Sequence, residues 1–358
     1  MNIIQEIGGL ERLMIKKNND VKHHEFHHNE LTGKTKKSMV TRIISAIVLV
    51  ILVVPSIFLG DWIYFGLMMI ALGFACYEIL GCAGKRTVFI YIVYFIFVAL
   101  IAIWPMFKGI VINSAAFTRP DPYFNTIYLP ITIVVVGFFL LFWLTVIYKD
   151  FSVVDASFLI AMALLISLGF QCLFYLRYYP MTCLMVLTTN SFNFTVQNTV
   201  LPSILILYVF LSAIMTDTGA YFVGVLFGKT KMNERISPNK TWEGFFGGII
   251  VSIIVTFIVG LSFALSGNPI LDFLDIEHWY NILIISVLIP FFATLGDFVF
   301  SAIKRYWGIK DYGKIIPGHG GVLDRLDSIF FAAIVASVAV FIISHMTGFE
   351  LNWVDILV

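Results

Sequence analysis

Residues able to bind phosphate and a metal ion are concentrated in one stretch of the chain, 296–327. Asp297 and Ser301 are four positions apart, so their side chains share one face wherever the helix continues. A glycine-rich turn, Pro-Gly-His-Gly-Gly, follows at 317–321. The ionisable and hydroxyl side chains of interest are Asp297, Ser301, Lys304, Arg305, Lys310, His319, Asp324, Arg325 and Asp327.

The basic, glycine and acidic members of this stretch suit different parts of one ligand. Lys and Arg complement phosphate charge, and Arg does so with two parallel hydrogen bonds. Glycines let backbone N–H groups approach an anion, and a helix N-terminus adds a partial positive charge. Carboxylates beside a basic cluster oppose anion binding unless a divalent cation joins them to the phosphates, and Mg²⁺ takes one or two carboxylates plus substrate oxygens. The stretch therefore predicts a polyphosphate site with Mg²⁺.

A second set of polar residues lies upstream, in 217–243. Asp217 is expected in the last turn of one apolar span, as Asp297 is in another. An ionisable group costs roughly 2.5–3.5 kcal/mol at the centre of a spanning helix, so such residues are usually paired or functional. The run Ser-Pro-Asn-Lys-Thr at 237–241 is interpreted as a tight turn whose polar groups suit a phosphate or a nucleoside edge. Its candidate binding residues are Ser237, Asn239, Lys240 and Thr241.

Several of these residues have a structural alternative. Asp324 and Asp327 could stabilise the dipole of the helix that follows them, and the basic residues before them could be interfacial anchors. Ser237 or Thr241 could cap the next span. Glu78 is a carboxylate inside an apolar run and has no evident partner in the sequence.

The elements that must position these residues are predicted to be membrane helices. Of the 358 residues, 59% are hydrophobic and 13% are charged, with a mean hydropathy of +0.93. Soluble domains have about 45–50% apolar and about 25% charged residues, so the composition excludes a soluble globular, disordered or fibrous protein. We expect an all-α polytopic membrane protein with about nine transmembrane helices. The candidate spans are 42–60, 62–80, 87–107, 127–148, 156–176, 199–220, 244–266, 281–300 and 328–347.

The distribution of charge predicts the orientation of these spans. If the N-terminus is cytoplasmic and the spans alternate, all but three of the 23 Lys and Arg residues lie inside, as the positive-inside rule requires. The three exceptions are Lys108, Arg119 and Arg177. The net charge of +1 gives no bulk signal for nucleic acid.

Three functional parts are expected along the chain. Residues 1–41 form a polar cytoplasmic tail without an apolar run of signal-peptide length, and the first span then serves as an uncleaved anchor. Residues 42–198 form scaffold helices. Residues 199–358 form the catalytic membrane domain, with cytoplasmic loops at 228–243 and 301–327.

The run from Ser301 to Asp327 resembles the signature of phosphatidate cytidylyltransferases, also called CDP-diacylglycerol synthases. The resemblance continues upstream through Gly296-Asp297, the run SPNKTWEG at 237–244 and the run DTGAY at 217–221. It covers about 215–330, whereas the first five spans match only in being apolar. It implies that CTP and phosphatidic acid react to give CDP-diacylglycerol and pyrophosphate in phospholipid biosynthesis.

The resemblance also implies roles for individual residues. It places Mg²⁺ on Asp297 and Asp324, and leaves room for a monovalent cation such as K⁺ nearby. We assign catalytic roles to Lys304, Arg305, His319 and Asp327. We assign substrate contacts to Asp217, Ser237, Asn239, Lys240, Thr241, Ser301, Lys310 and Arg325. The expected partners are CTP, phosphatidic acid and the lipid of a bacterial-type inner membrane, with no nucleic acid; a homodimer is an open alternative.

Three other functions compete with this interpretation. A polyprenol or phytol kinase that uses CTP would also suit the two upstream runs, but the full signature at 301–327 argues against it. A transporter or channel would be expected to have broken helices and polar residues at mid-span. A membrane anchor gives no reason for Asp217 and Asp297.

Overall fold

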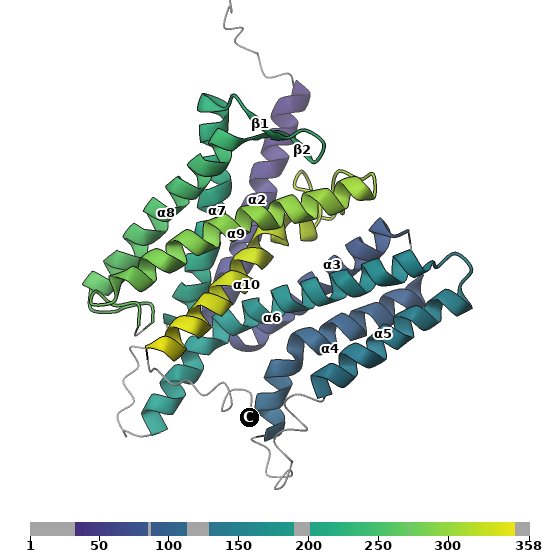
Figure 1. The fold of residues 1–358 in the computed structure, drawn as a ribbon, viewed down its shortest axis with the longest axis horizontal. Helices are drawn as coiled ribbons and strands as arrows, with labels where there is room; N and C mark the ends of the chain where they lie inside the picture. The colour runs from purple at the N-terminus through teal and green to yellow at the C-terminus, as the bar shows by residue number, and fades with distance from the viewer. Residues whose placement is uncertain (1–32, 85–86, 113–128, 190–200, 272, 348–358) are drawn as a thin grey trace, which may run out of the picture.

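The computed structural model describes residues 33–84, 87–112, 129–189, 201–271 and 273–347, and nearly all of them are helical (Figure 1). Apolar runs of this length form helices in lipid because a helix satisfies its backbone hydrogen bonds within one segment. The nine helices in the described ranges are α2 (Gly33–Leu59), α3 (Asp61–Cys82), α4 (Val88–Ile112), α5 (Leu129–Ile147), α6 (Val153–Thr189), α7 (Leu201–Phe227), α8 (Trp242–Leu265), α9 (Trp279–Tyr306) and α10 (Leu323–Met346).

The all-α polytopic prediction is confirmed. Within the described residues, seven helices are long and apolar enough to cross a membrane, and two shorter apolar stretches lie at Val88–Trp104 and Ile131–Ile147. The protein is therefore a multi-pass membrane protein with about nine spans. Most of the predicted tail at 1–41 lies outside the described residues.

Helix ends differ from the sequence-based boundaries near the site. The prediction that Asp217 and Asp297 occupy last turns is wrong, because α7 and α9 continue well past them. Likewise α10 begins at Leu323 and includes Asp324 and Asp327. A single aspartate does not end a helix whose apolar character continues, and the apolar helical stretches here extend to Phe227 and Tyr306.

The segment 228–243 is more ordered than the predicted loop. Strands β1 (Lys231–Asn233) and β2 (Ser237–Thr241) pair antiparallel and form the two-stranded sheet of the described region. The Asn233 side chain closes the hairpin by accepting hydrogen bonds from the backbone N–H groups of Arg235 and Ile236, at 3.1 and 3.2 Å. The interpretation of 237–241 as a tight turn is therefore wrong: this run is a strand that leads directly into α8.

The two halves of the chain share one buried core. Its members come from α3, α4 and α6 as well as from α7, α9 and α10. The Phe170 and Phe330 rings join α6 to α10 with centroids 5.2 Å apart. Helices α7 and α8 approach so closely that a Cβ at Gly248 would lie 2.6 Å from the Thr216 carbonyl oxygen.

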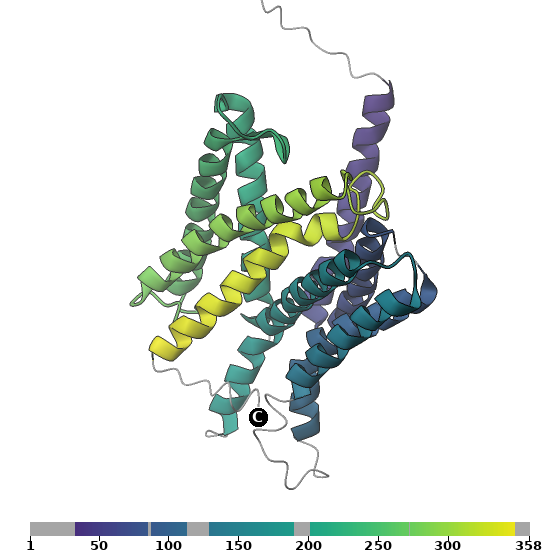
Figure 2. The ribbon, with the colours of Figure 1, turned by 45° about the vertical axis from the view of Figure 1, so that its right-hand side comes forward.

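The hairpin and the segment between α9 and α10 lie at the same end of the bundle (Figures 1 and 2). A direct contact joins them, because Arg305 Nε donates to the Ile236 carbonyl at 3.1 Å. Two chain segments rich in polar residues are thus brought together at one end of the helices.

Candidate active site

An ion pair joins the hairpin to the middle of α9. β2 carries Lys240 to α9, where its ammonium group pairs with Asp297 Oδ2. Ser301, one turn further along α9, donates to Asp297 Oδ1 at 3.3 Å. The Lys240 and Asp297 side chains are 29% and 25% exposed, so this pair is open to an incoming ligand. We call it the open pair.

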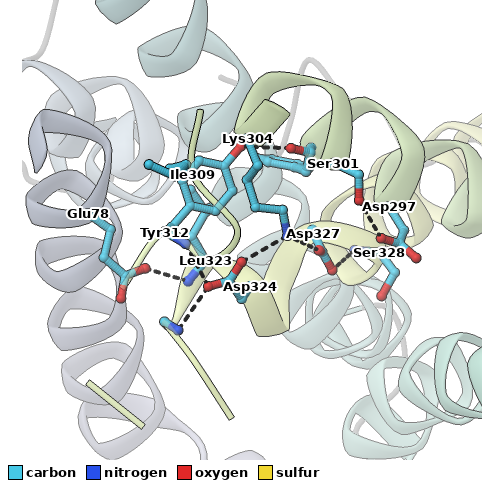
Figure 3. A network of polar contacts seen from close by, with 12 residues as sticks. Glu78, Asp297, Ser301, Lys304, Ile309, Tyr312, Leu323, Asp324, Asp327 and Ser328 are labelled. Atoms are coloured by element: carbon cyan, nitrogen blue, oxygen red, sulfur yellow. Dashed lines mark hydrogen bonds and ion pairs between the residues drawn. The ribbon is translucent and has the colours of Figure 1, made fainter. Parts of the chain in front are cut away.

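A second cluster lies deeper, between α9 and α10. Lys304 Nζ is 2.9 Å from Asp324 Oδ1 and 3.7 Å from Asp327 Oδ2. Figure 3 shows the lysine side chain reaching both carboxylates. These three side chains are only 10%, 3% and 11% exposed. We call them the buried triad.

The second oxygen of Asp324 is also occupied. Asp324 Oδ2 accepts from the backbone N–H groups of Tyr312 and Gly321, each at 2.9 Å. The next two amides, of Val322 and Leu323, donate to Glu78 at 2.9 and 2.8 Å. Carboxylates of the protein itself therefore fill the N-terminus of α10. In this structure the three consecutive amides of 321–323 have carboxylate partners, and phosphate binding by the glycine turn stays a prediction.

Electrostatic interactions connect the open pair to the buried triad. Asp327 interacts with Asp297, Lys304 and Asp217. Asp217, on α7, interacts with Asp297, Lys240 and Arg325. The structure thus brings together charged residues that the sequence places in three separate helices and one strand.

The oxygen donors of this region fit a divalent cation. Four carboxylates lie among two lysines and Arg325, and hard oxygen ligands are those that Mg²⁺ prefers. In the described part of the chain, no group of three or more His, Cys, Asp or Glu side chains is arranged so that it could hold a metal ion by itself. Mg²⁺ needs only one or two carboxylates when substrate phosphates supply the other oxygens, so the donor set suits a shared protein–substrate site.

His319 contacts the first helix of the described chain. Its Nδ1 is 2.7 Å from the Ser45 hydroxyl of α2. Partial burial and the charges of Arg325 and Arg42 lower the pKa of His319 below its ordinary value of 6.5. The imidazole is therefore neutral near pH 7 and suits hydrogen bonding better than charge pairing. No sequence pattern indicates Ser45 or Arg42, because contacts between distant segments have no periodicity.

The other predicted site residues fall into two groups: some are hydrogen-bonded within the protein, and some make no side-chain hydrogen bond or ion pair in the described part of the chain. Arg305 donates to two backbone carbonyls, those of Ile236 and Ile309, at 3.1 and 2.9 Å. Thr241 caps α8 by accepting from the Gly244 N–H at 3.1 Å, so its structural alternative is confirmed. Within the described residues, no side-chain hydrogen bond or ion pair is made by Ser237, Asn239 or Lys310. Their substrate contacts stay predictions.

Comparison with known proteins identifies a family for the chain. The sequence model of the cytidylyltransferase family matches residues 40–343. A protein of Staphylococcus saprophyticus named phosphatidate cytidylyltransferase is 39% identical over 194 residues, which is 54% of this chain and 62% of that protein. A protein of the same name from Staphylococcus haemolyticus is 50% identical over 126 residues, 35% of this chain and 45% of that protein.

The relatives and the family model cover different shares of the chain. The chain spans about half to three-fifths of the length of the curated relatives it matches. The family match, by contrast, takes in most of the chain, including the hairpin, the open pair and the buried triad. The chain belongs to the cytidylyltransferase family.

Proposed function

We propose that this protein transfers the CMP moiety of CTP to phosphatidic acid and so produces CDP-diacylglycerol and pyrophosphate. Membership of the cytidylyltransferase family and the names of the Staphylococcus relatives support this reaction. The observation that carries it is the open pair, in which a strand lysine meets a helix aspartate beside further carboxylates. Such a pair supplies both a ligand for a metal and a cation for phosphate.

The proposed metal ligands are Asp297 and Asp324. Bound Mg²⁺ would offset the charge on the nucleotide phosphates. Within the described residues, each oxygen of Asp297 has one hydrogen-bonding partner, and both partners are side chains. Asp324 keeps Oδ1 on the Lys304 side while Oδ2 is fixed by two backbone amides. A monovalent cation nearby stays part of the proposal.

The bond changes need little acid–base help from the protein. A phosphate oxygen of phosphatidic acid forms a bond to the α-phosphorus of CTP, and the bond from that phosphorus to the pyrophosphate oxygen breaks. No proton has to move when the attacking phosphate is ionised. Catalysis is then positioning and charge neutralisation.

Basic side chains around the acidic cluster perform that positioning. Lys240, released from Asp297 when a ligand enters, holds the departing pyrophosphate. Arg325 is exposed, and its guanidinium suits two phosphate oxygens at once. Lys304 stays between Asp324 and Asp327 and keeps these carboxylates in place. Arg305 and His319 complete the predicted catalytic set, Arg305 by fixing the hairpin and neutral His319 as a hydrogen-bond donor.

The location of the site suits a lipid substrate. The bundle end that carries both polar segments would face the cytoplasm, where CTP is found, with the N-terminus on the same side. Apolar side chains such as Ile250, Ile254 and Ile258 of α8 are exposed along one stripe, as expected for contact with acyl chains. We assign catalysis to 199–358 and a scaffold role to 42–198, in a bacterial-type inner membrane.

The position of the label in CTP tests the reaction. Membranes containing the protein receive Mg²⁺, phosphatidic acid and CTP labelled at either the α- or the γ-phosphorus. We expect label in lipid from the α-position only. Label in lipid from the γ-position would indicate a kinase, and no labelled lipid from either would contradict the proposal.

A further inference from the structure

Glu78 is a buried carboxylate of the predicted scaffold that contacts the segment leading into α10. It lies in α3 and its residue is 1% exposed. Oε1 accepts from the Val322 N–H at 2.9 Å and Oε2 from the Leu323 N–H at 2.8 Å. These partners are 244 and 245 positions away in the sequence.

This contact replaces a local helix cap. The residue at the N-cap position of α10 is Val322, which has no side-chain group able to accept a hydrogen bond. The first N–H groups of a helix lack intrahelical partners, and a negative charge there is favourable. Glu78 therefore supplies from another helix what a serine or aspartate usually supplies next to the helix.

Two glycines make room for the carboxylate. A Cβ at Gly321 would lie 2.5 Å from Glu78 Oε1, and a Cβ at Gly313 would also collide with that oxygen. Gly313 lies near the middle of the segment between α9 and α10, and Gly321 lies near its end. Two separate points of this segment thus approach one carboxylate, and Figure 3 shows the contact at Leu323, where α10 begins.

The same three amides connect Glu78 to the buried triad. Gly321 donates to Asp324, whereas the next two amides donate to Glu78. Asp324 in turn presents its other oxygen to Lys304 at 2.9 Å. The place of Asp324 is therefore set jointly by its own backbone and by the carboxylate of α3.

We propose that Glu78 is a positioning residue for catalysis, which acts through the N-terminus of α10 to place Asp324 and Lys304. The catalytic part of this inference rests on the proposed function. It gives α3 a role in the reaction, because this helix holds the N-terminus of α10, which carries Asp324, in its position. Glu78 touches neither substrate nor reacting atoms.

Asp155 provides a matched control for a purely structural cap. It is a buried carboxylate in the same half of the chain and accepts from the Ser152 N–H at 2.8 Å, at the N-terminus of α6. Asp155→Asn and Glu78→Gln each remove one buried charge from a helix N-terminus. Glu78 contacts the two amides that lead to Asp324, whereas Asp155 accepts from Ser152 next to its own helix.

The experiment compares these variants in the full chain, purified in detergent. Hydrogen exchange is followed by mass spectrometry on peptides from 309–326 and, as a reference, from α7. We expect Glu78→Gln to speed exchange in 309–326 by about tenfold or more, because each buried amide left without a partner costs free energy. The α7 peptides should be unchanged, and Asp155→Asn should leave both sets as in the wild type.

Kinetics give the second measurement. We expect Glu78→Gln to lower kcat by about tenfold or more while the KM for CTP changes less than about threefold. Glu78→Asp, which keeps the charge, should recover part of kcat. If Glu78→Gln does not fold, Gly313→Ala displaces the same carboxylate and should speed exchange in 309–326.

Two results would overturn the inference. One is exchange in 309–326 that matches the wild type in Glu78→Gln. The other is faster exchange spread equally over all peptides, as general destabilisation would give. Exchange is read whether or not the protein turns over, so a wild-type chain that makes no CDP-diacylglycerol contradicts the proposed function without deciding the exchange result.

Discussion

The open pair and the buried triad are two lysine–aspartate clusters that each include one residue of α9, and they differ in exposure. Lys240 and Asp297 keep 29% and 25% of their side-chain surface. Lys304, Asp324 and Asp327 keep 10%, 3% and 11%. Exposed ion pairs contribute about 0–1 kcal/mol, whereas removing one partner of a buried pair costs about 3–5 kcal/mol.

This difference in exposure indicates that the two clusters have different roles in ligand binding. The open pair can separate when a ligand binds, because water can hydrate the Lys240 and Asp297 charges while they are apart. The buried triad cannot separate cheaply, so it maintains the geometry against which a ligand binds. The predictions below follow this contrast, from the largest effect to the smallest.

Asp324→Asn should have the largest effect, and it should be on stability. The substitution removes the nearer of the two carboxylates that pair with Lys304 in a buried site. We therefore expect the free energy of unfolding to fall by about 3–5 kcal/mol. Denaturant or thermal unfolding in detergent measures it. Asp275→Asn, which breaks the exposed Asp275–His278 pair, should cost no more than about 1 kcal/mol. Equal losses of unfolding free energy in Asp324→Asn and Asp275→Asn would contradict the proposed difference between buried and exposed ion pairs.

Asp297→Asn should separate activity from stability. We expect CDP-diacylglycerol formation to fall by about a hundredfold or more, the usual result of removing one group that stabilises transition-state charge. Unfolding should change by no more than about 1 kcal/mol, because the Lys240–Asp297 pair is exposed. Lipid labelling and unfolding on the same preparation give both numbers. Full activity at limiting Mg²⁺ would contradict the metal assignment.

Lys240→Met should have a moderate effect on the nucleotide. The loss of one charge-assisted hydrogen bond to phosphate predicts about a tenfold rise in the KM for CTP. The KM for phosphatidic acid should stay the same, because we place this lysine on the pyrophosphate side. An equal change in both constants would move Lys240 away from that position.

His319 should give the smallest effect, seen as a pH dependence. The pKa of His319 is lower in the folded protein than its ordinary value of 6.5, which applies to the unfolded chain. Between the folded and the unfolded pKa, the unfolded chain binds a proton that the folded protein does not. Stability should therefore decrease as the pH falls through this window. The melting temperature of His319→Gln should drop less between pH 7 and pH 5.5 than that of the wild type. An identical drop would show that other groups cause it.

The helices and the shared face of Asp297 and Ser301 could be predicted from the sequence for a clear physical reason. Apolar runs report membrane helices directly, and the four-residue spacing of Asp297 and Ser301 correctly placed them on one face. The signature residues at 301–327 converge because α9 and α10 pack side by side. These features depend on local periodicity or on neighbouring helices.

Other features depend on contacts between distant segments and could not be predicted. Glu78 was noticed as an acid in an apolar run, but its partners are backbone amides, which carry no sequence signal. Ser45 and His319 meet across 274 positions. The hairpin formed where proline and asparagine indicated a turn, because β2 pairs with β1 and carries Lys240 to Asp297.

The most direct test of the central claim is the binding of a divalent cation at the open pair. Mn²⁺, which prefers the same oxygen ligands as Mg²⁺, can be followed by electron paramagnetic resonance in the presence of CTP. The account predicts that Asp297→Asn weakens Mn²⁺ binding by about tenfold or more, whereas the exposed-pair control Asp275→Asn binds Mn²⁺ like the wild type. Equal Mn²⁺ affinity in the wild type and in Asp297→Asn would contradict it.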